Sequence, residues 1–190
     1  MNIKLLTSIS VLLLSGIVTS VQASDFSYSY IEGSVESVDS DDPDADIYRI
    51  SGSYNISPNF NIIADLATGD IDNPSGANDI DLDEGSLGIA YHTPIAQSSD
   101  FTANLKAINR DSDLVEDDTG YGVGVGLRHM LSDRIEVDAN VDFVDVQEVE
   151  DTALKVGARY YFNSAISAGL AYSTSSEDID VVSGNIRWDY

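Results

Sequence analysis

The feature that most restricts the fold of this chain is an alternation of apolar and polar residues with a period of two. A two-residue period places successive side chains on opposite faces of a strand. The runs are about ten residues long, the length that a tilted strand needs to cross a bilayer. Ten such runs are recognised, at 25–36, 46–56, 59–68, 83–93, 100–110, 120–130, 134–146, 152–162, 165–174 and 180–190.

The segments between these runs fall into two groups that alternate along the chain. One group consists of short turns, at 57–59, 94–99, 131–133 and 163–164. The other group is acidic, at 39–46, 69–83, 111–119, 147–151 and 175–180. Outer-membrane barrels alternate short periplasmic turns with longer extracellular loops. The sequence therefore predicts an all-β, antiparallel up-and-down transmembrane β-barrel of about ten strands, with eight as the alternative if weaker runs such as 25–36 are loop.

The first 23 residues differ from the rest of the chain and predict a secretory signal peptide. Lys4 gives a positively charged start, residues 5–21 are mostly apolar, and Val21-Gln22-Ala23 offers small residues at a cleavage position. An amino-terminal membrane anchor is the alternative, but serines and threonines interrupt the apolar run. We expect a signal peptide at 1–23, cleavage near Ala23 after export through the inner membrane, and a barrel domain at 24–190 in the cell outer membrane.

The alternation alone does not decide whether the apolar face points to lipid or to the core of a soluble barrel. In 46–56, for example, Tyr48 and Ile50 oppose Arg49 and Ser51. Two patterns favour lipid. Apolar faces end in aromatic residues near the short turns, as an interfacial girdle would. The predicted girdle consists of Tyr54, Phe60, Tyr91, Phe101, Tyr160, Phe162, Trp188 and Tyr190.

The second pattern is the position of the basic residues, which fall on the polar faces of strands beside carboxylates. Such a face would line a narrow lumen, where pairing offsets the desolvation of each charge. The glycines Gly122, Gly124 and Gly126 share one of these faces and would make room for long Arg and Lys side chains from facing strands. In the first run, Glu32 is expected to point inward with Tyr28 and Tyr30. The predicted lumen ion-pair network comprises Arg49, Asp65, Lys106, Arg128, Glu136, Asp138, Asp142, Lys155, Arg159 and Arg187.

Composition excludes several functions. The formal net charge of −24 argues against nucleic acid as a partner, and the absence of cysteine excludes disulfides and thiolate metal sites. Neither His92 nor His129 has a Ser or Cys in an arrangement that indicates an activated nucleophile. Residues 70–76 begin like a calcium loop, but Pro74 and Ser75 replace the expected ligand and glycine. We therefore expect no enzyme and no cofactor, with at most diffuse divalent cations at the acidic loops.

Some segments resemble a known family. Residues 26–33 (FSYSYIEG), the acidic stretch 44–46 (DAD) and residues 57–62 (SPNFNI) resemble small outer-membrane proteins of proteobacteria, in particular the family once proposed as an activator of plant immunity. That resemblance implies an outer-membrane barrel and supplies no catalytic residues. The carboxyl-terminal strand, which ends at Trp188 and Tyr190, resembles the signal that the barrel-assembly machinery reads, and strand addition would explain such recognition.

The sequence favours a structural or surface-exposed barrel, monomeric, with its lumen largely closed by ion pairs. The alternatives are a narrow porin-like channel for small solutes, a surface adhesin or receptor that acts through its acidic extracellular loops, and a soluble periplasmic ligand-binding barrel. Expected partners are outer-membrane lipid, lipopolysaccharide and the barrel-assembly machinery. Whether the lumen conducts, and which ligand or host partner the protein has, does not follow from the sequence.

Overall fold

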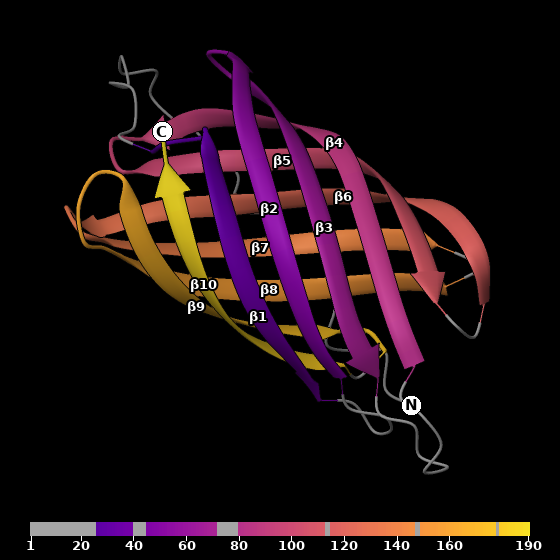
Figure 1. Cartoon of the computed structure of the whole chain (residues 1–190). Helices are drawn as coiled ribbons and strands as arrows, with labels where there is room; N and C mark the ends of the chain where they lie inside the picture. The colour runs from indigo at the N-terminus through magenta and orange to yellow at the C-terminus, as the bar shows by residue number, and fades with distance from the viewer. Residues whose placement is uncertain (1–25, 40–44, 72–79, 113–114, 147–148, 178) are drawn as a thin grey trace, which may run out of the picture.

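The protein is a closed barrel of antiparallel strands (Figure 1). The computed structural model describes residues 26–39, 45–71, 80–112, 115–146, 149–177 and 179–190. The predicted signal peptide at 1–23 lies outside these residues. The strands are β1 (Tyr30–Asp39), β2 (Ala45–Ser57), β3 (Phe60–Ile71), β4 (Ile80–Ala96), β5 (Ser99–Ser112), β6 (Val115–Ser132), β7 (Ile135–Val146), β8 (Val149–Tyr161), β9 (Ile166–Ser175) and β10 (Asp180–Asp189).

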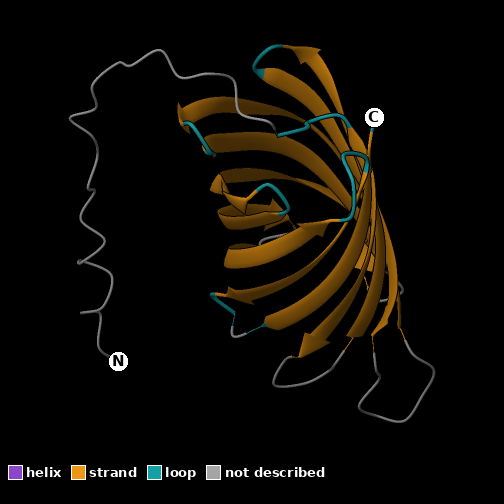
Figure 2. Cartoon of the chain, turned by 90° about the vertical axis from the view of Figure 1, so that its left-hand side faces the viewer, coloured by secondary structure: helices purple, strands orange, loops and turns teal. Residues whose placement is uncertain are grey.

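Each strand pairs with its neighbours in sequence, and β1 pairs with β10 to close the sheet. The closing ladder runs from Tyr30 opposite Asp189 to Asp39 opposite Asp180. In the orthogonal view the strands curve around a common interior (Figure 2). The prediction of an up-and-down antiparallel barrel is confirmed, with ten strands rather than eight.

The two ends of the barrel differ in the kind of connection that joins their strands. At one end, called here the turn end, lie the start of β1, the end of β10 and turns as short as Pro58-Asn59 and Asp133-Arg134. At the opposite end, called here the loop end, lie the end of β1, the start of β2 and the other strand ends that flank the acidic stretches of the sequence, most of which fall outside the described residues. This is the alternation that the sequence predicts, because hairpins in an up-and-down sheet reverse direction at alternate ends.

Several predicted strand boundaries were wrong. The first strand begins at Tyr30 and not at residue 25, and residues 26–29 precede it without strand structure. Several acidic residues predicted in loops belong to strands instead, among them Asp111 of β5, Asp118 of β6 and Asp151 of β8. Strand pairing satisfies backbone hydrogen bonds while acidic side chains remain in water, so charge alone does not end a ladder.

Apolar side chains cover the outside of the barrel, and polar ones fill its inside. Only Tyr28, Ile108 and Val146 are buried among the large apolar side chains of the described residues. By contrast, exposed apolar side chains occur on every strand: Ile31, Ile50, Leu66, Leu87, Leu105, Val123, Val141, Val156, Leu170 and Ile186. This distribution is the inverse of that in a water-soluble protein, and it matches a barrel whose outer surface faces acyl chains. The described part of the chain contains no helix that is long and apolar enough to cross a membrane.

The outward apolar face predicts the effect of a charge placed in it. Val141 lies near the middle of β7 with its side chain exposed. We expect Val141→Arg to lower the free energy of unfolding in lipid vesicles by about 2–4 kcal/mol, the cost of Arg at the bilayer midplane. The matched control is Ser132→Arg at the turn end, where Ser132 is exposed at the end of β6 and the cost should stay below about 1 kcal/mol. Equal costs at the two positions would contradict a lipid-facing β7.

Candidate functional site in the barrel interior

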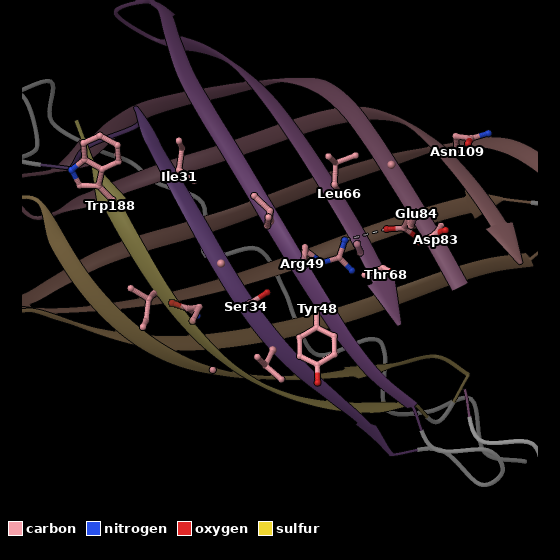
Figure 3. A pocket seen from close by; sticks show the side chains of 18 of the residues that line it. Ile31, Ser34, Tyr48, Arg49, Leu66, Thr68, Asp83, Glu84, Asn109 and Trp188 are labelled. Atoms are coloured by element: carbon pink, nitrogen blue, oxygen red, sulfur yellow. Dashed lines mark hydrogen bonds and ion pairs between the residues drawn. The ribbon is translucent and has the colours of Figure 1, made fainter. Parts of the chain in front are cut away.

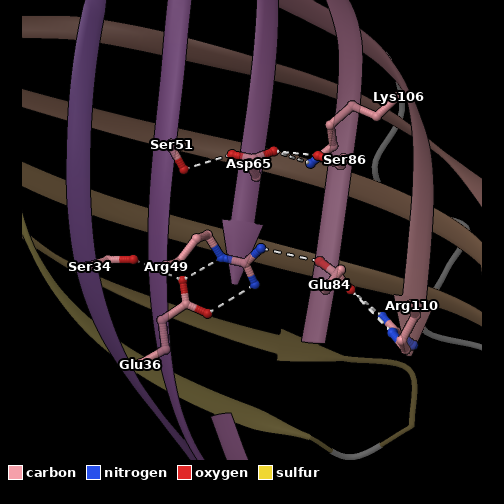
Figure 4. Close-up of polar contacts among 9 residues, drawn as sticks. All are labelled: Ser34, Glu36, Arg49, Ser51, Asp65, Glu84, Ser86, Lys106 and Arg110. Atoms are coloured by element: carbon pink, nitrogen blue, oxygen red, sulfur yellow. Dashed lines mark hydrogen bonds and ion pairs between the residues drawn. The ribbon is translucent and has the colours of Figure 1, made fainter. Parts of the chain in front are cut away.

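The loop-end half of the interior holds a chain of charges along one wall. The Arg49 guanidinium on β2 donates to the Glu36 carboxylate on β1 at 3.0 Å and to Glu84 on β4 at 3.2 Å. Arg110 on β5 donates to the same Glu84 carboxylate at 2.7 Å. Arg49 therefore reaches past β3 and links strands that are not adjacent (Figure 4). The charges follow the β1–β5 wall and do not cross the interior.

A second group on this wall surrounds the carboxylate of Asp65 on β3. Ser51 and Ser86 donate their hydroxyls to its two oxygens, each at 2.7 Å, and the Lys106 ammonium lies 3.5 Å away (Figure 4). Two hydroxyl donors and one cation satisfy most of the acceptor capacity of this carboxylate. The wall group is thus a connected polar network and not a set of isolated pairs.

The turn-end half contains the most deeply buried charges. Arg128 on β6 makes a bidentate pair with Glu136 on β7, at 2.8 and 2.9 Å, and Tyr161 donates its hydroxyl to the same carboxylate at 2.6 Å. The Arg128 side chain is 9% exposed and that of Glu136 is 2% exposed. A buried bidentate pair fixes both side chains, since Nε and Nη2 of Arg128 each donate to one carboxylate oxygen of Glu136.

Glu32 on β1 forms the other turn-end group, which joins strands across the closing ladder. Its Oε2 accepts from Arg159 on β8 at 2.7 Å and from Arg187 on β10 at 2.9 Å. The Arg187 guanidinium also lies 3.9 Å from the centre of the Tyr30 ring, a cation–π contact. Because β8 is three strands away from β1 in the ring, the Glu32–Arg159 pair spans part of the interior.

The structure brings some of the predicted network residues together and separates others. Lys106 pairs with Asp65, and Arg128 pairs with Glu136. Arg49, Arg159 and Arg187 pair instead with carboxylates outside the predicted set. Asp138 accepts from Asn140 at 3.0 Å, and among the described residues no ion pair engages Asp138, Asp142 or Lys155.

Sequence reasoning left Glu32, Glu36, Glu84 and Tyr161 out of the network. Each lies an even number of positions from the other polar-face residues of its strand. That spacing could have assigned all four to the predicted network. Glu32 and Glu36 also lie four residues apart on β1, so one face of that strand carries both acceptors. Parity identifies the candidates but not which of them meet across the interior.

The glycines on β6 face the interior, where side chains of the paired strands lie close to them. A Cβ at Gly124 would overlap the side chains of Asp142 and Asn104, and one at Gly126 would overlap Asn140. Short Asn and Asp side chains of the paired strands are the nearest side chains at Gly124 and Gly126, and room for Arg and Lys from facing strands stays a prediction. Side chains of the adjacent strands therefore crowd the inner face of β6, which explains glycine at these positions.

The predicted girdle residues lie near the turn end, most of them on the outer surface. Tyr54, Phe60, Tyr160, Phe162, Trp188 and Tyr190 are exposed, whereas Tyr91 and Phe101 are half-buried. Three ring contacts join members of this set: Phe60–Tyr91 at 5.2 Å, Tyr160–Phe162 at 5.3 Å and Trp188–Tyr190 at 5.6 Å between centroids. These edge and tilted contacts are the geometries that aromatic pairs prefer.

The two histidines have different surroundings. His92 is buried and points into the interior, whereas His129 is exposed and its Nδ1 lies 2.8 Å from the Ser99 hydroxyl. The sequence indicated no such serine, because the contact comes from cross-strand pairing of β5 with β6. Among the described residues no carboxylate is seen to hydrogen-bond Nε2 of His129. The Ser99–His129 pair therefore lacks the third group of a catalytic triad there.

No group of three or more His, Asp or Glu side chains within the described ranges could hold a metal ion. Most of the sequence that resembles a calcium loop, from residue 72 onward, lies outside those ranges.

A hollow of about 1220 Å³ lies against the wall formed by β10 and β1–β5 (Figure 3). Its apolar lining includes Ile31, Ile50 and Trp188, all of which are exposed on the outer surface. Gly33 contributes to it because nothing lies within 4 Å of where its Cβ would be. Its lining also includes Ser34, Arg49 and Glu84, which belong to the interior charge network, so residues from both faces of this wall contribute to the hollow.

Comparisons with known proteins agree with this architecture. The family model described as "Outer membrane protein beta-barrel domain" matches residues 9–162. The chain is similar in structure to the KdgM porin, with a TM-score of 0.53, 7% identity, and coverage of 85% of this chain and 99% of that one. It is also similar to an outer membrane channel from Pseudomonas putida F1 (TM-score 0.53, 10% identity, coverage 90% and 100%).

A third similar structure is the β domain of the Bordetella autotransporter BrkA, with a TM-score of 0.56, 9% identity, and coverage of 85% of this chain and 98% of that one. No curated protein sequence matches the chain. At these identities the likeness to solved structures concerns the fold alone.

The burial of the Arg128–Glu136 pair predicts its contribution to stability. We expect Glu136→Gln to lower the free energy of unfolding by about 3–5 kcal/mol, because it leaves the Arg128 guanidinium buried without its carboxylate. The comparison variant is Lys106→Gln, since the Lys106 side chain is 28% exposed and Asp65 keeps its two serine donors. Its cost should be about 1 kcal/mol or less. Urea unfolding in lipid vesicles measures both, and a smaller loss for Glu136→Gln than for Lys106→Gln would contradict this ranking.

Proposed function

This chain belongs to the outer membrane protein β-barrel domain family, and on that premise we propose a monomeric barrel with a structural or surface-exposed role and a lumen largely closed by ion pairs. The observation that carries the proposal is the convergence of charges at the turn end. Arg128, Arg159 and Arg187 come from three different strands, and each side chain is less than one-tenth exposed.

Burial of these guanidinium groups bears directly on conduction. Hydrated charges would line an aqueous pore, whereas these are paired with Glu136 and Glu32 and have little contact with solvent. An ion that passed this level would have to separate a buried pair, which is strongly unfavourable. The turn-end half of the barrel is therefore the barrier in this proposal.

A narrow channel for small solutes is the second candidate, and the loop-end half supports it. There the charged side chains of Arg49 and Arg110 remain 23% and 36% exposed and follow one wall. Two similar structures are a porin and an outer membrane channel, and a conducting role would follow if their activity extended to this chain. A surface adhesin or receptor acting through the acidic loops is a third candidate, and those loops lie largely outside the described residues.

The remaining assignments complete the proposal. Residues 1–23 act as a signal peptide that is cleaved near Ala23, and the resemblance of residues 24–66 to the family once linked to plant immunity stays a prediction. Exposed aromatic residues at the turn end form an interfacial girdle, supported by their outward position. We propose that the barrel-assembly machinery recognises β10. Lipopolysaccharide and diffuse divalent cations contact the acidic loop end.

Planar-bilayer recording of the purified, refolded barrel tests the closed lumen. We expect no steady conductance from the unmodified chain. The double variant E32S/R187S removes a turn-end pair and should conduct, because it replaces two long buried side chains with short ones. The matched double variant E36S/R49S removes a loop-end pair of the same kind and should stay closed. Steady, salt-scaled conductance of the unmodified barrel would overturn this proposal and favour the channel.

A further inference from the structure

The residues just before β1 fold into the turn-end mouth of the barrel and do not extend away from it. Residues 26–29, called here the amino-terminal segment, belong to no strand, yet Tyr28 is only 6% exposed. Tyr28 is one of three buried large apolar side chains in the described residues, so its burial is unusual in a barrel whose apolar groups face outward.

Tyr28 makes three kinds of contact with the inner wall. Its hydroxyl donates to Asp100 Oδ2 on β5 at 2.8 Å, and its ring stacks on His92 of β4 with centroids 3.6 Å apart and planes 14° from parallel. Its backbone carbonyl accepts from the Ser53 hydroxyl on β2 at 2.7 Å. Because β4 and β5 lie three and four strands from β1 in the ring, Tyr28 reaches across the mouth.

Arg128 connects the segment to the turn-end ion pairs. Its guanidinium carbon lies 4.6 Å from the centre of the Phe26 ring and 4.7 Å from that of Tyr28. Its Nη1 also donates to the Ser27 carbonyl at 3.3 Å. Since β6 lies five strands from β1 in a ring of ten, Arg128 contacts the segment from the opposite wall. Ring-stacking, cation–π and hydrogen-bond contacts from four strands thus meet on Phe26, Ser27 and Tyr28.

We propose that the turn-end mouth is a binding site for the chain's own amino-terminal segment, which acts as a plug and whose release opens the lumen to small ions. This inference rests on the proposed closed lumen and names the part that completes the closure. The mouth supplies a stacking surface at His92, an acceptor at Asp100 and a cation at Arg128, the three groups that the ring and hydroxyl of Tyr28 engage.

Thiol labelling measures the docking of the segment without reference to conduction. The chain has no cysteine, so Ser27→Cys introduces a single reactive group into the plug. We expect slow reaction with a membrane-impermeant maleimide in the otherwise unmodified barrel. Adding Tyr28→Ala should raise the rate by more than about tenfold, because it removes a hydrogen bond to a charged group, which alone is worth about tenfold in the opening equilibrium, and also the ring stacked on His92. Tyr28→Phe keeps the stacked ring and should give a smaller increase.

The matched control is Tyr54→Ala, which truncates the same residue type at the same end of the barrel. Tyr54 is 60% exposed on the outer surface and should not affect labelling at position 27. Heat-modifiable gel migration of each variant establishes that its barrel is folded. An equal labelling rate with and without Tyr28→Ala, in folded barrels, overturns the plug.

Bilayer recordings of the same variants separate the plug from the closed lumen. We expect Tyr28→Ala to show channel openings while Tyr54→Ala and the unmodified barrel remain silent, because the segment and the turn-end ion pairs form one constriction through Arg128, and loss of the Tyr28 ring loosens it. Silence of Tyr28→Ala overturns the plug as a barrier and leaves the ion-pair closure standing. Steady conductance of the unmodified barrel, with Ser27→Cys still protected, overturns both the closed lumen and the sealing role of the segment.

Discussion

The backbone hydrogen bonds between β1 and β10 are the interaction on which the rest of the structure depends. In hydrocarbon no water can satisfy an unpaired N–H or C=O, so a sheet can cross a membrane only if it has no free edge. The two strands are ten residues long and pair from Tyr30 opposite Asp189 to Asp39 opposite Asp180. Closure in turn encloses an interior, and period-two alternation then places every second side chain inside it.

The enclosed interior explains why charges concentrate there and how they differ along the barrel axis. At the loop end they remain partly hydrated and follow one wall, as the Asp65 group does. At the turn end they are desolvated, and Glu32 and Arg128 make contacts that pass between distant strands. The amino-terminal segment occupies the same level through Tyr28, so ion pairs and plug act on one constriction. In the function proposed here, a single level near one end therefore controls whether the lumen is continuous.

The fold followed from the sequence because its main signal is local. Ile50 and Arg49 are neighbours on opposite faces, and the structure exposes the first and pairs the second inside. The ion-pair partners could not be predicted from the sequence. The alternation gives the face on which a side chain lies, but the residue that it meets across the barrel depends on strand register and curvature. Glu32 meets Arg159 from more than a hundred residues away for that reason. The end of β5 at Ser112 was missed because polar residues also pair in ladders outside lipid, and the start of β1 at Tyr30 was missed because residues 26–29 keep the alternating pattern without forming a strand.

The central claim is that the outward apolar face contacts acyl chains, and Trp188 tests it most directly. It is the only tryptophan in the chain and is 54% exposed on the outer face of β10. Its fluorescence can be measured in vesicles whose lipids carry bromine on their acyl chains, and again with aqueous acrylamide as the quencher. The account predicts strong quenching by the brominated lipid and weak quenching by acrylamide. Strong quenching by acrylamide with none from the lipid would contradict it.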